Sequence, residues 1–407
     1  MRICVIDADL RQQNVRLQPQ CYMHAVCHWL VEVGEEVLIM SDGYPSLPAE
    51  DSVGGLPVHR IGHVRFPPIV GNKSLSKVLP SYKPDIILWH LGLTSLLHLR
   101  FGSKMPAPVL GILTSPLYST GEVATVGWGD LIRRFPSFLP HMVGALLPKP
   151  CPRWLLGTRE FERLVVMTQT TRHRLARLGF PEEQIQVIPP GVDKVFLDLA
   201  SQDHSKAEEL RLRLGINREN FMVLFAGSPE LYRGLSDILE ALPLVLRQAP
   251  HTRLVVLSRI TGNNSMSDQR TAQRLCHSLK LKGYVSFVTD LLSPEAIVQY
   301  MYAADAVVLP FRLVASGIPI TLLEALALGT SVIVTGVAGM EEFVSDKQGF
   351  VVPAHSPKAL ADALVTSAAQ RHDKTKTLEA SSVIRSWSQV GQEIYRLMHS
   401  ILEQSSV

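Results

Sequence analysis

The sequence predicts an α/β protein made of two doubly wound parallel sheets, one in each half of the chain. Short apolar runs alternate with helical patterns, and this alternation favours βαβ units and parallel sheets. The alternation is interrupted at a Pro- and Gly-containing segment near residue 190 and then restarts. The 407 residues also fit two domains, at roughly 100–200 residues per domain.

The first half begins directly with an apolar run and predicts an N-terminal domain over residues 1–190. An amphipathic helix is expected over residues 21–33, between the first two strands. The expected strands are residues 3–6, 36–40, 57–61, 85–90, 109–113, 164–167 and 186–188.

The second half repeats the pattern after a break at residues 189–193 (PPGVD) and a polar stretch at 200–208. We place the linker there and predict a C-terminal domain over residues 200–381. A final helix over residues 382–402 carries Trp387 and Tyr395 at spacings suited to packing on another element. The expected strands are residues 221–225, 253–257, 285–288, 306–309, 331–335 and 350–352.

Composition excludes several classes of protein. Hydrophobic residues make up 46% and charged residues 19%, so the chain can bury full cores and is not disordered. No apolar run reaches the about 18 residues of a spanning helix, and the N-terminus does not resemble a signal peptide. Five cysteines, an odd number without a repeated spacing, are typical of reduced thiols. We therefore expect a cytoplasmic protein.

Basic residues are concentrated in one part of the chain. The net charge is only +3, but residues 52–181 hold 16 Lys and Arg against 5 Asp and Glu. This asymmetry predicts an anionic partner, such as a lipid headgroup, a phosphate or an acidic polymer; the alternative is an ordinary solvated surface. Residues 135–156 are apolar, broken by prolines and flanked by arginines, which favours peripheral contact with the inner face of a membrane over a connection packed on the domain.

Two strand-to-helix turns in the second half have features that suit a phosphate. The first covers residues 225–234, where Gly227 permits close backbone approach and Arg233 can pair with a diphosphate. The second covers residues 315–321, where a Gly-Ile-Pro turn opens a helix and leaves backbone N–H groups free for an anion. Glu324 follows in an apolar stretch, where a carboxylate needs a partner or ligand hydroxyls. The alternatives are a plain turn with a surface arginine and a glutamate stabilised by the helix dipole.

Five segments and the final helix carry a pattern along the chain, the segments being residues 189–193, 227–234, 303–310, 316–324 and 337–344. In this order they resemble the retaining nucleotide-sugar glycosyltransferases of family 4, which have the two-domain GT-B fold. The match covers most of the chain and is most specific in the C-terminal half. The final helix with Trp387 is similar to the family's closing helix, so residues 382–407 are expected to pack back on the first domain. The similar motifs are "IPNGVD" at residues 189–193, "GRLxxxKG" at 227–234, "AD-hydrophobic-P" at 303–310, Glu-x7-Glu at 316–324 and "xGGxxEfV" at 337–344.

The resemblance implies a role for each donor-side residue. Arg233 would bind the donor diphosphate, and Glu324 would hold the ribose hydroxyls. Glu342 would support the donor pocket. The diphosphate and the sugar would be cradled, without a metal or other cofactor, by the backbone amides of Gly317, Ile318, Ile320 and Thr321. Ser316, directly before them, is also placed on the donor side. The implied function is transfer of a sugar, with retention, to an acceptor that is a lipid-linked glycan, a polysaccharide or a small molecule; no nucleic acid is implied.

The chain departs from the family pattern at positions that contact the sugar. Ser316 replaces the first glutamate of Glu-x7-Glu, and Ser228 replaces the loop arginine. Thr114 stands where the family has a histidine, and His90 at the end of a neighbouring strand is a second acceptor-side candidate or else a satisfied buried histidine. These departures keep open an alternative, a catalytically silent binder of sugar nucleotides or glycans that serves as a partner subunit.

Two other signals are set aside. Cys21, His24 and His28 fall on one helical face, but no second ligand cluster accompanies them, so a core role is favoured over a metal. A nicotinamide cofactor is disfavoured because the first strand is not followed by Gly-x-Gly-x-x-Gly.

Overall fold

The computed structural model describes most of the chain. The described residues are 1–44, 46–62, 75, 77–92, 105–126, 145, 161–198, 204–260, 262–290, 292–314, 317–371 and 384–405.

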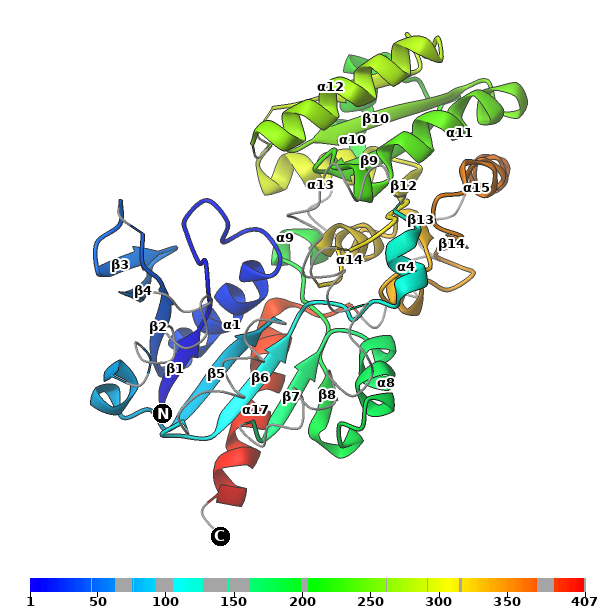
Figure 1. Cartoon of the computed structure of the whole chain (residues 1–407). Coiled ribbons are helices and arrows are strands. Elements are labelled where there is room, and N and C mark those ends of the chain that lie inside the picture. The colour runs from blue at the N-terminus through cyan, green and yellow to red at the C-terminus, as the bar shows by residue number, and fades with distance from the viewer. Residues whose placement is uncertain are drawn as a thin grey trace.

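The first unit is built on an eight-stranded sheet in the order β3-β4-β2-β1-β5-β6-β7-β8 (Figure 1). All neighbouring strands are parallel except β3 and β4, which pair antiparallel. Central strands such as β6, with the sequence VLGIL, are buried throughout, as expected for parallel strands covered on both faces. The strands are β1 (Arg2–Ile6), β2 (Glu36–Asp42), β3 (Glu50–Val53), β4 (Leu56–Ile61), β5 (Ile86–Leu91), β6 (Val109–Leu113), β7 (Arg163–Val166) and β8 (Ile185–Val187).

The second unit is built on a six-stranded sheet in the order β11-β10-β9-β12-β13-β14, and all of its pairs are parallel. Its strands are β9 (Phe221–Gly227), β10 (Thr252–Ser258), β11 (Val285–Val288), β12 (Ala306–Leu309), β13 (Ser331–Thr335) and β14 (Gly349–Val352).

Helices cover both sheets. The α-helices are α1 (Gln20–Glu32), α4 (Thr120–Ala124), α8 (Gln169–Arg177), α9 (Lys194–Leu197), α10 (His204–Arg213), α11 (Leu235–Gln248), α12 (Asn263–Ser278), α13 (Pro294–Ala303), α14 (Ile320–Ala327), α15 (Pro357–Gln370) and α17 (Trp387–Ser405). The 3-10 turns are η1 (Glu182–Gln184), η3 (Leu231–Arg233) and η4 (Met340–Phe343). Among the described helices, none is long and apolar enough to cross a membrane.

The chain passes between the units twice, and the two crossings touch each other. Val192 pairs with Ser386 in a parallel bridge, and the Val192 N–H donates to the Arg385 carbonyl at 2.9 Å. A Cβ on Gly191 would lie 2.6 Å from the backbone nitrogen of Trp387, so a residue without a side chain is required there.

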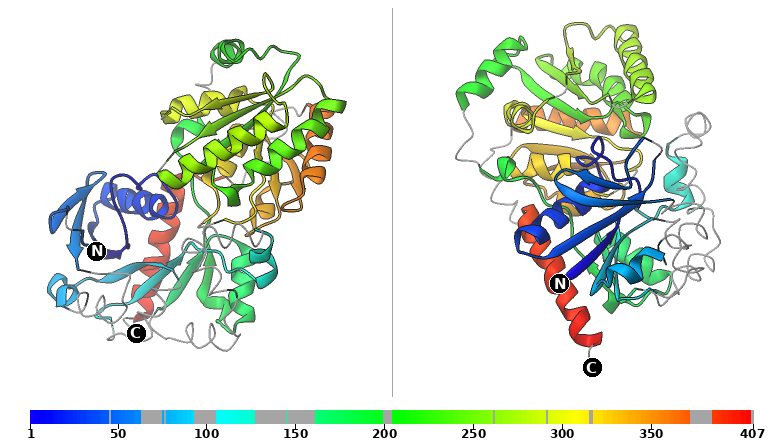
Figure 2. Two further views of the ribbon diagram at one scale, coloured as in Figure 1. Left: turned by 45° about the horizontal axis from the view of Figure 1, so that its top comes forward. Right: turned by 90° about the vertical axis from the view of Figure 1, so that its left-hand side faces the viewer.

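α17 then returns to the first unit and packs on α1 (Figure 2). Trp387 meets Tyr22 edge to face, and Tyr395 meets Trp29 in the same way, with ring centroids 5.8 and 5.7 Å apart. The expected return of the C-terminal helix to the first domain is confirmed.

The hydrophobic core is continuous between the units. One cluster includes Val26 of α1, Val192 of the linker, Leu322 of α14 and Ile394 of α17, so apolar packing joins both sheets and the returning helix. Two further clusters lie on the other faces of the first and second sheets. The units are therefore joined by packed side chains as well as by the two chain crossings.

The predicted strands and helices are found with small shifts at their ends, and two elements differ more. β3 was not expected, because its sequence EDSV has no apolar run; it pairs at the edge through a turn at Gly54 and Gly55, both with positive φ. α17 begins at Trp387 and not at residue 382. Ser386 explains this start, because it pairs with the linker and its hydroxyl accepts the Gln389 N–H at 3.2 Å.

Candidate functional site

The carboxyl ends of the two sheets meet where segments after β6 and β12 touch. In parallel sheets ligands bind beyond this end of the strands. The Gly317 N–H, after β12, donates to the Thr114 carbonyl, after β6, at 2.7 Å. α4, which follows β6, also lies against the second unit (Figure 1), and Thr125 donates to the Arg312 carbonyl at 3.4 Å. The contact brings together Gly317 and Thr114, two of the residues that the sequence singled out.

Arg233 lies across the end of β9. A Cβ on Gly227 would lie 3.1 Å from a guanidinium nitrogen of Arg233, and the guanidinium sits 5.3 Å above the Phe311 ring. Gly234 ends η3 with φ +72°, and a Cβ there would collide with the Pro310 carbonyl. The Nε atom of Arg233 is buried and lies 3.8 Å from the Glu230 carboxylate, an ion pair too long for a hydrogen bond, so Nε makes no hydrogen bond to the described residues. The arginine is thus fixed in place with a donor still available.

Arg259 is a second cation beside Arg233, and the sequence analysis missed it. It follows β10, and its backbone N–H donates to the Gly227 carbonyl at 3.0 Å. Burial and the neighbouring Arg233 lower the pKa of Arg259, while Glu230 and Glu324 raise it. Its buried Nε also lacks a hydrogen-bond partner within the described part of the chain. No motif marks Arg259, because it is brought to the site by pairing of β10 with β9.

Glu324 lies on α14 near these cations. Burial, with a smaller contribution from Asp193, raises the pKa of Glu324 to about 8, and Arg259 opposes the rise. A carboxyl group in such an environment takes up hydrogen-bond donors readily when a ligand brings them. The geometry therefore offers two guanidinium groups and one carboxyl group in a single region.

The sequence predicts free backbone donors at the start of α14, and the Gly317 N–H is not one of them. The N-cap of this helix, Pro319, makes no side-chain cap hydrogen bond. Ile320 and Thr321 open the helix, and Ile318 is buried just before it. Gly317, with φ +60°, donates its N–H to Thr114. Ser316 lies outside the described residues.

Glu342 reaches the other unit. Its carboxylate accepts the N–H groups of Gln169 and Thr170, at 2.7 and 2.6 Å, at the start of α8. A carboxylate is favoured at a helix N-terminus by the free N–H groups and the helix dipole. The structure thus gives Glu342 a contact between the units, which motif matching had not anticipated.

His90 and Thr114 are in contact, and Asp7 joins them. His90 Nδ1 lies 2.7 Å from Asp7 Oδ1, and His90 Nε2 lies 2.9 Å from Thr114 Oγ1. Asp7 and Thr114 are 1% and 2% exposed. Asp7 and Thr114 follow β1 and β6, and His90 is the last residue but one of β5. These three strands are neighbours in the sheet, so their carboxyl ends lie together.

Two further polar side chains, those of Ser228 beside Gly227 and of Gln18, lack hydrogen-bond partners among the described residues. The Ser228 hydroxyl is buried without a hydrogen bond to the described residues, as are both amide atoms of Gln18. A Cβ on Gly317 would lie 3.4 Å from the Gln18 side chain, so this glutamine faces the same loop. Unsatisfied buried polar groups are uncommon and mark places where a ligand or water supplies the missing bond.

The other sequence signals lie elsewhere. The rings of His24 and His28 pack at 4.5 Å, His28 bonds the Gly54 carbonyl, and burial lowers the pKa of His24 to about 4. Among the described residues, no group of three or more His, Cys, Asp or Glu is placed to hold a metal ion. Residues 135–156, the candidate membrane contact, lie outside the described part apart from residue 145.

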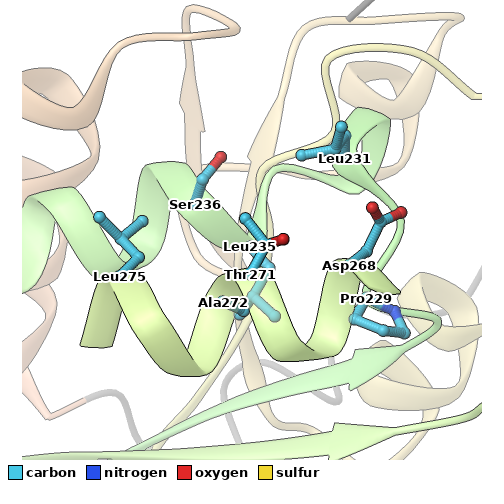
Figure 3. Close-up of a pocket in the computed structure, with 8 residues that line it drawn as sticks. All are labelled: Pro229, Leu231, Leu235, Ser236, Asp268, Thr271, Ala272 and Leu275. Carbon is cyan, nitrogen blue, oxygen red and sulfur yellow. The ribbon is translucent and has the colours of Figure 1, made fainter. Parts of the chain in front are cut away.

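A small pocket lies behind the Gly227–Gly234 loop, away from the contact between the sheets. Figure 3 shows side chains from this loop, α11 and α12 around it, including Pro229, Ser236 and Asp268. Its lining holds no cation, so it does not share the chemistry of the site at Glu324.

Two parallel α/β units that meet at the carboxyl ends of their sheets define the GT-B class of proteins, and solved structures of this class match nearly the whole chain. The Anabaena protein HepE in complex with UDP matches with a TM-score of 0.74 and 16% identity, over 98% of this chain and 100% of its own. A glycosyltransferase from Rickettsia africae matches with a TM-score of 0.72 and 15% identity, over 98% of each chain. The predicted fold is confirmed.

Family models identify the particular family. The model described as "Glycosyltransferase Family 4" matches residues 20–195, and the one described as "Glycosyl transferases group 1" matches residues 220–370. The chain therefore belongs to the family 4 type of glycosyltransferase.

Curated relatives agree with this assignment. A D-inositol 3-phosphate glycosyltransferase of Xylanimonas cellulosilytica is 32% identical over 50% of this chain and 48% of its own length. The chain thus spans about half the length of this relative and of similar ones from Paenarthrobacter aurescens and Jonesia denitrificans. An uncharacterized glycosyltransferase of Methanocaldococcus jannaschii is 24% identical over 82% of this chain and 80% of its own length.

Proposed function

We propose that this protein transfers a sugar, with retention of configuration, from a nucleoside diphosphate sugar to an acceptor bound on the first unit. The observation that carries the proposal is Arg259 after β10, whose charge interacts with both Arg233 and Glu324, while its backbone N–H donates to the Gly227 carbonyl at 3.0 Å. Two cations suit a diphosphate, and a carboxyl group suits the two hydroxyls of a ribose. Structures of HepE with UDP and with UDP-glucose make these ligands the natural first probes.

In the proposed reaction the chain stabilises the leaving diphosphate. The bond between the anomeric carbon and the diphosphate oxygen breaks, and a bond from the acceptor oxygen forms on the same face. The acceptor proton passes to the leaving phosphate. Arg233, Arg259 and the backbone N–H groups at the start of α14 hold the charge that develops, which needs no metal. Contact between the units excludes water and so limits hydrolysis.

The acceptor is proposed to bind beyond β1, β5 and β6, where His90 and Thr114 lie. A glycan, a lipid-linked glycan or a small molecule with a free hydroxyl fits this chemistry. The basic excess over residues 52–181 supports an anionic acceptor or an anionic membrane surface close to this unit.

The first test is a thermal-shift panel with UDP, GDP, ADP and TDP, with and without magnesium. A ligand at 100 times its Kd stabilises the fold by about 2.7 kcal/mol, which raises the Tm measurably. We expect a shift with one diphosphate that does not depend on magnesium. Glu324→Ala, Arg233→Ala and Arg259→Ala should each remove the shift, and Glu240→Ala and Arg274→Ala on exposed helix faces should keep it. A panel without any shift would overturn the proposed site.

Turnover is the second part of the test. Release of nucleoside diphosphate from the matching sugar nucleotide, measured with a set of hydroxyl acceptors, should be seen with the wild-type protein. Binding of the nucleotide without any transfer or hydrolysis would favour a silent sugar-nucleotide binder.

A further inference from the structure

Tyr118 of the first unit holds the backbone of the segment between β12 and α14 of the second unit, which we call the donor loop because it precedes the proposed donor site on α14. Tyr118 follows β6 and is 8% exposed. Its hydroxyl donates to the Val314 carbonyl at 2.6 Å and accepts the Val314 N–H at 2.7 Å. One hydroxyl from the first unit therefore satisfies both backbone groups of a residue in the second.

A second contact lies three residues further along the same loop. The Thr114 carbonyl accepts the Gly317 N–H at 2.7 Å, and Gly317 holds φ at +60°. Residues 114 and 118 of one unit thus hold residues 314 and 317 of the other. The helix α14, with the backbone donors and Glu324 of the proposed site, begins directly after this loop.

The Thr114 side chain is itself held by a hydrogen bond to His90 within the first unit. Asp7 accepts a hydrogen bond from His90 Nδ1, which leaves His90 Nε2 to accept the Thr114 hydroxyl. Asp7, His90 and Thr114 come from three neighbouring strand ends. The support is therefore a hydrogen-bonded chain that runs from the end of β1 to the donor loop.

We propose that Tyr118 is a positioning residue for the donor, assisted by Asp7, His90 and Thr114, so that the first unit completes the donor site of the second. The inference rests on the proposed function, because it assumes that the loop before α14 binds the donor. If the Val314 N–H and carbonyl lose the Tyr118 hydroxyl, two buried polar groups are left without a partner and the donor loop is held less firmly. Donor binding that requires this position of the loop is then weakened. Donor affinity then depends on the contact between the units.

The test is Tyr118→Phe, which removes one hydroxyl and keeps the ring. We expect the affinity for the nucleoside diphosphate found in the panel to fall about tenfold, and the KM for its sugar nucleotide to rise by a similar factor. Binding is measured well below the Tm, where a residue that only stabilises the fold leaves affinity unchanged. Tyr82→Phe is the matched control, because the Tyr82 hydroxyl also meets backbone carbonyls but lies within the first unit.

A second variant tests the supporting chain independently. Thr114→Val removes the hydroxyl held by His90 and keeps the shape of the side chain. We expect a smaller loss of affinity in the same direction and recovery in Thr114→Ser. Wild-type affinity and KM in both Tyr118→Phe and Thr114→Val would overturn the inference.

The positioning role of Tyr118 and the proposed function would be contradicted by different results. If the wild-type protein binds the diphosphate and Glu324→Ala does not, an unchanged Tyr118→Phe contradicts only the positioning role. If no diphosphate binds at all, hydrogen exchange of residues 311–321 still tests the contact. Faster exchange in Tyr118→Phe than in Tyr82→Phe would support it, and equal exchange would overturn it.

Discussion

Glu324 shows how a single residue links burial to ligand binding. In an apolar helix its carboxyl group loses hydration, and the negative charge of Asp193 adds to the cost of ionising it. Arg259 compensates only in part, so the neutral form is favoured below about pH 8. Because the folded pKa lies above the ordinary value, the stability that this group contributes is present at low pH and is lost as the pH rises through about 8.

The pKa of Glu324 predicts a pH dependence of nucleotide binding. Ribose hydroxyls that donate to Glu324 favour its charged form, so binding below about pH 8 requires release of a proton. We expect the affinity to rise between pH 7 and pH 8 and then to level off, as measured by calorimetry. In Glu324→Gln the affinity should be weak at every pH and should lack this rise. The same rise in Glu324→Gln would show that another group titrates.

At the scale of elements, α17 depends on a close approach to α1. A Cβ on Gly391 would lie 2.6 Å from the Trp29 ring, too near for any side chain. The ring is also held by Tyr395, whose hydroxyl donates to Glu35 at 2.7 Å. Glycine here allows the returning helix to pack against the first unit, although glycine is unfavourable inside a helix.

Gly391→Ala should therefore destabilise the protein. Overpacking costs about 1–3 kcal/mol, and the gain in helix propensity of about 1 kcal/mol does not fully offset it. We expect a lower Tm in thermal unfolding. Gly121→Ala is the matched control, because Gly121 is an exposed helical glycine and a Cβ there would lie 4.0 Å from the Ser119 hydroxyl oxygen, an ordinary van der Waals distance. A Tm raised equally in both variants would contradict the packing argument.

At the scale of the whole molecule, several contacts hold the two units together in one arrangement. Tyr118 and Thr114 contact the donor loop, and Glu342 reaches the start of α8 from the opposite direction. Arg312, which is 6% exposed, forms a bidentate ion pair with Asp237 at 2.9 and 2.6 Å and also reaches the Val126 carbonyl at 3.4 Å. Enzymes that must admit and release substrates use such contacts to close around them.

Removing the Glu342 carboxylate should favour separation of the units. We expect Glu342→Ala to show a larger radius of gyration in solution scattering and a lower rate of sugar transfer, because the N–H groups at the start of α8 lose their acceptor. Far-UV circular dichroism should not change. Asp346→Ala, an exposed residue close by in sequence, is the control. An unchanged radius and rate would show that this contact does not hold the units together.

Part of the site could be predicted from the sequence because its residues follow one another along the chain. Gly227 and Arg233 share one turn, and Glu324 follows the turn at Gly317 within one helix, so motif spacing was enough to select them. Arg259, Asp7 and Tyr118 carry no such signal. Each joins the site through strand pairing or through contact between the units, and single-sequence patterns do not contain that information.

The two parallel sheets, the break between them and the family could be predicted from the sequence alone, because alternating apolar runs and turn residues are local properties of the chain. The sequence did not show which strand ends meet, that Gly191 lies against the returning chain at Trp387, or that Tyr118 and Thr114 contact the segment before α14. The physical reason is that these features depend on contacts between residues up to about 200 positions apart, such as Tyr118 and Val314, whose sequence separation is 196. Such contacts form only when both sheets have folded and packed.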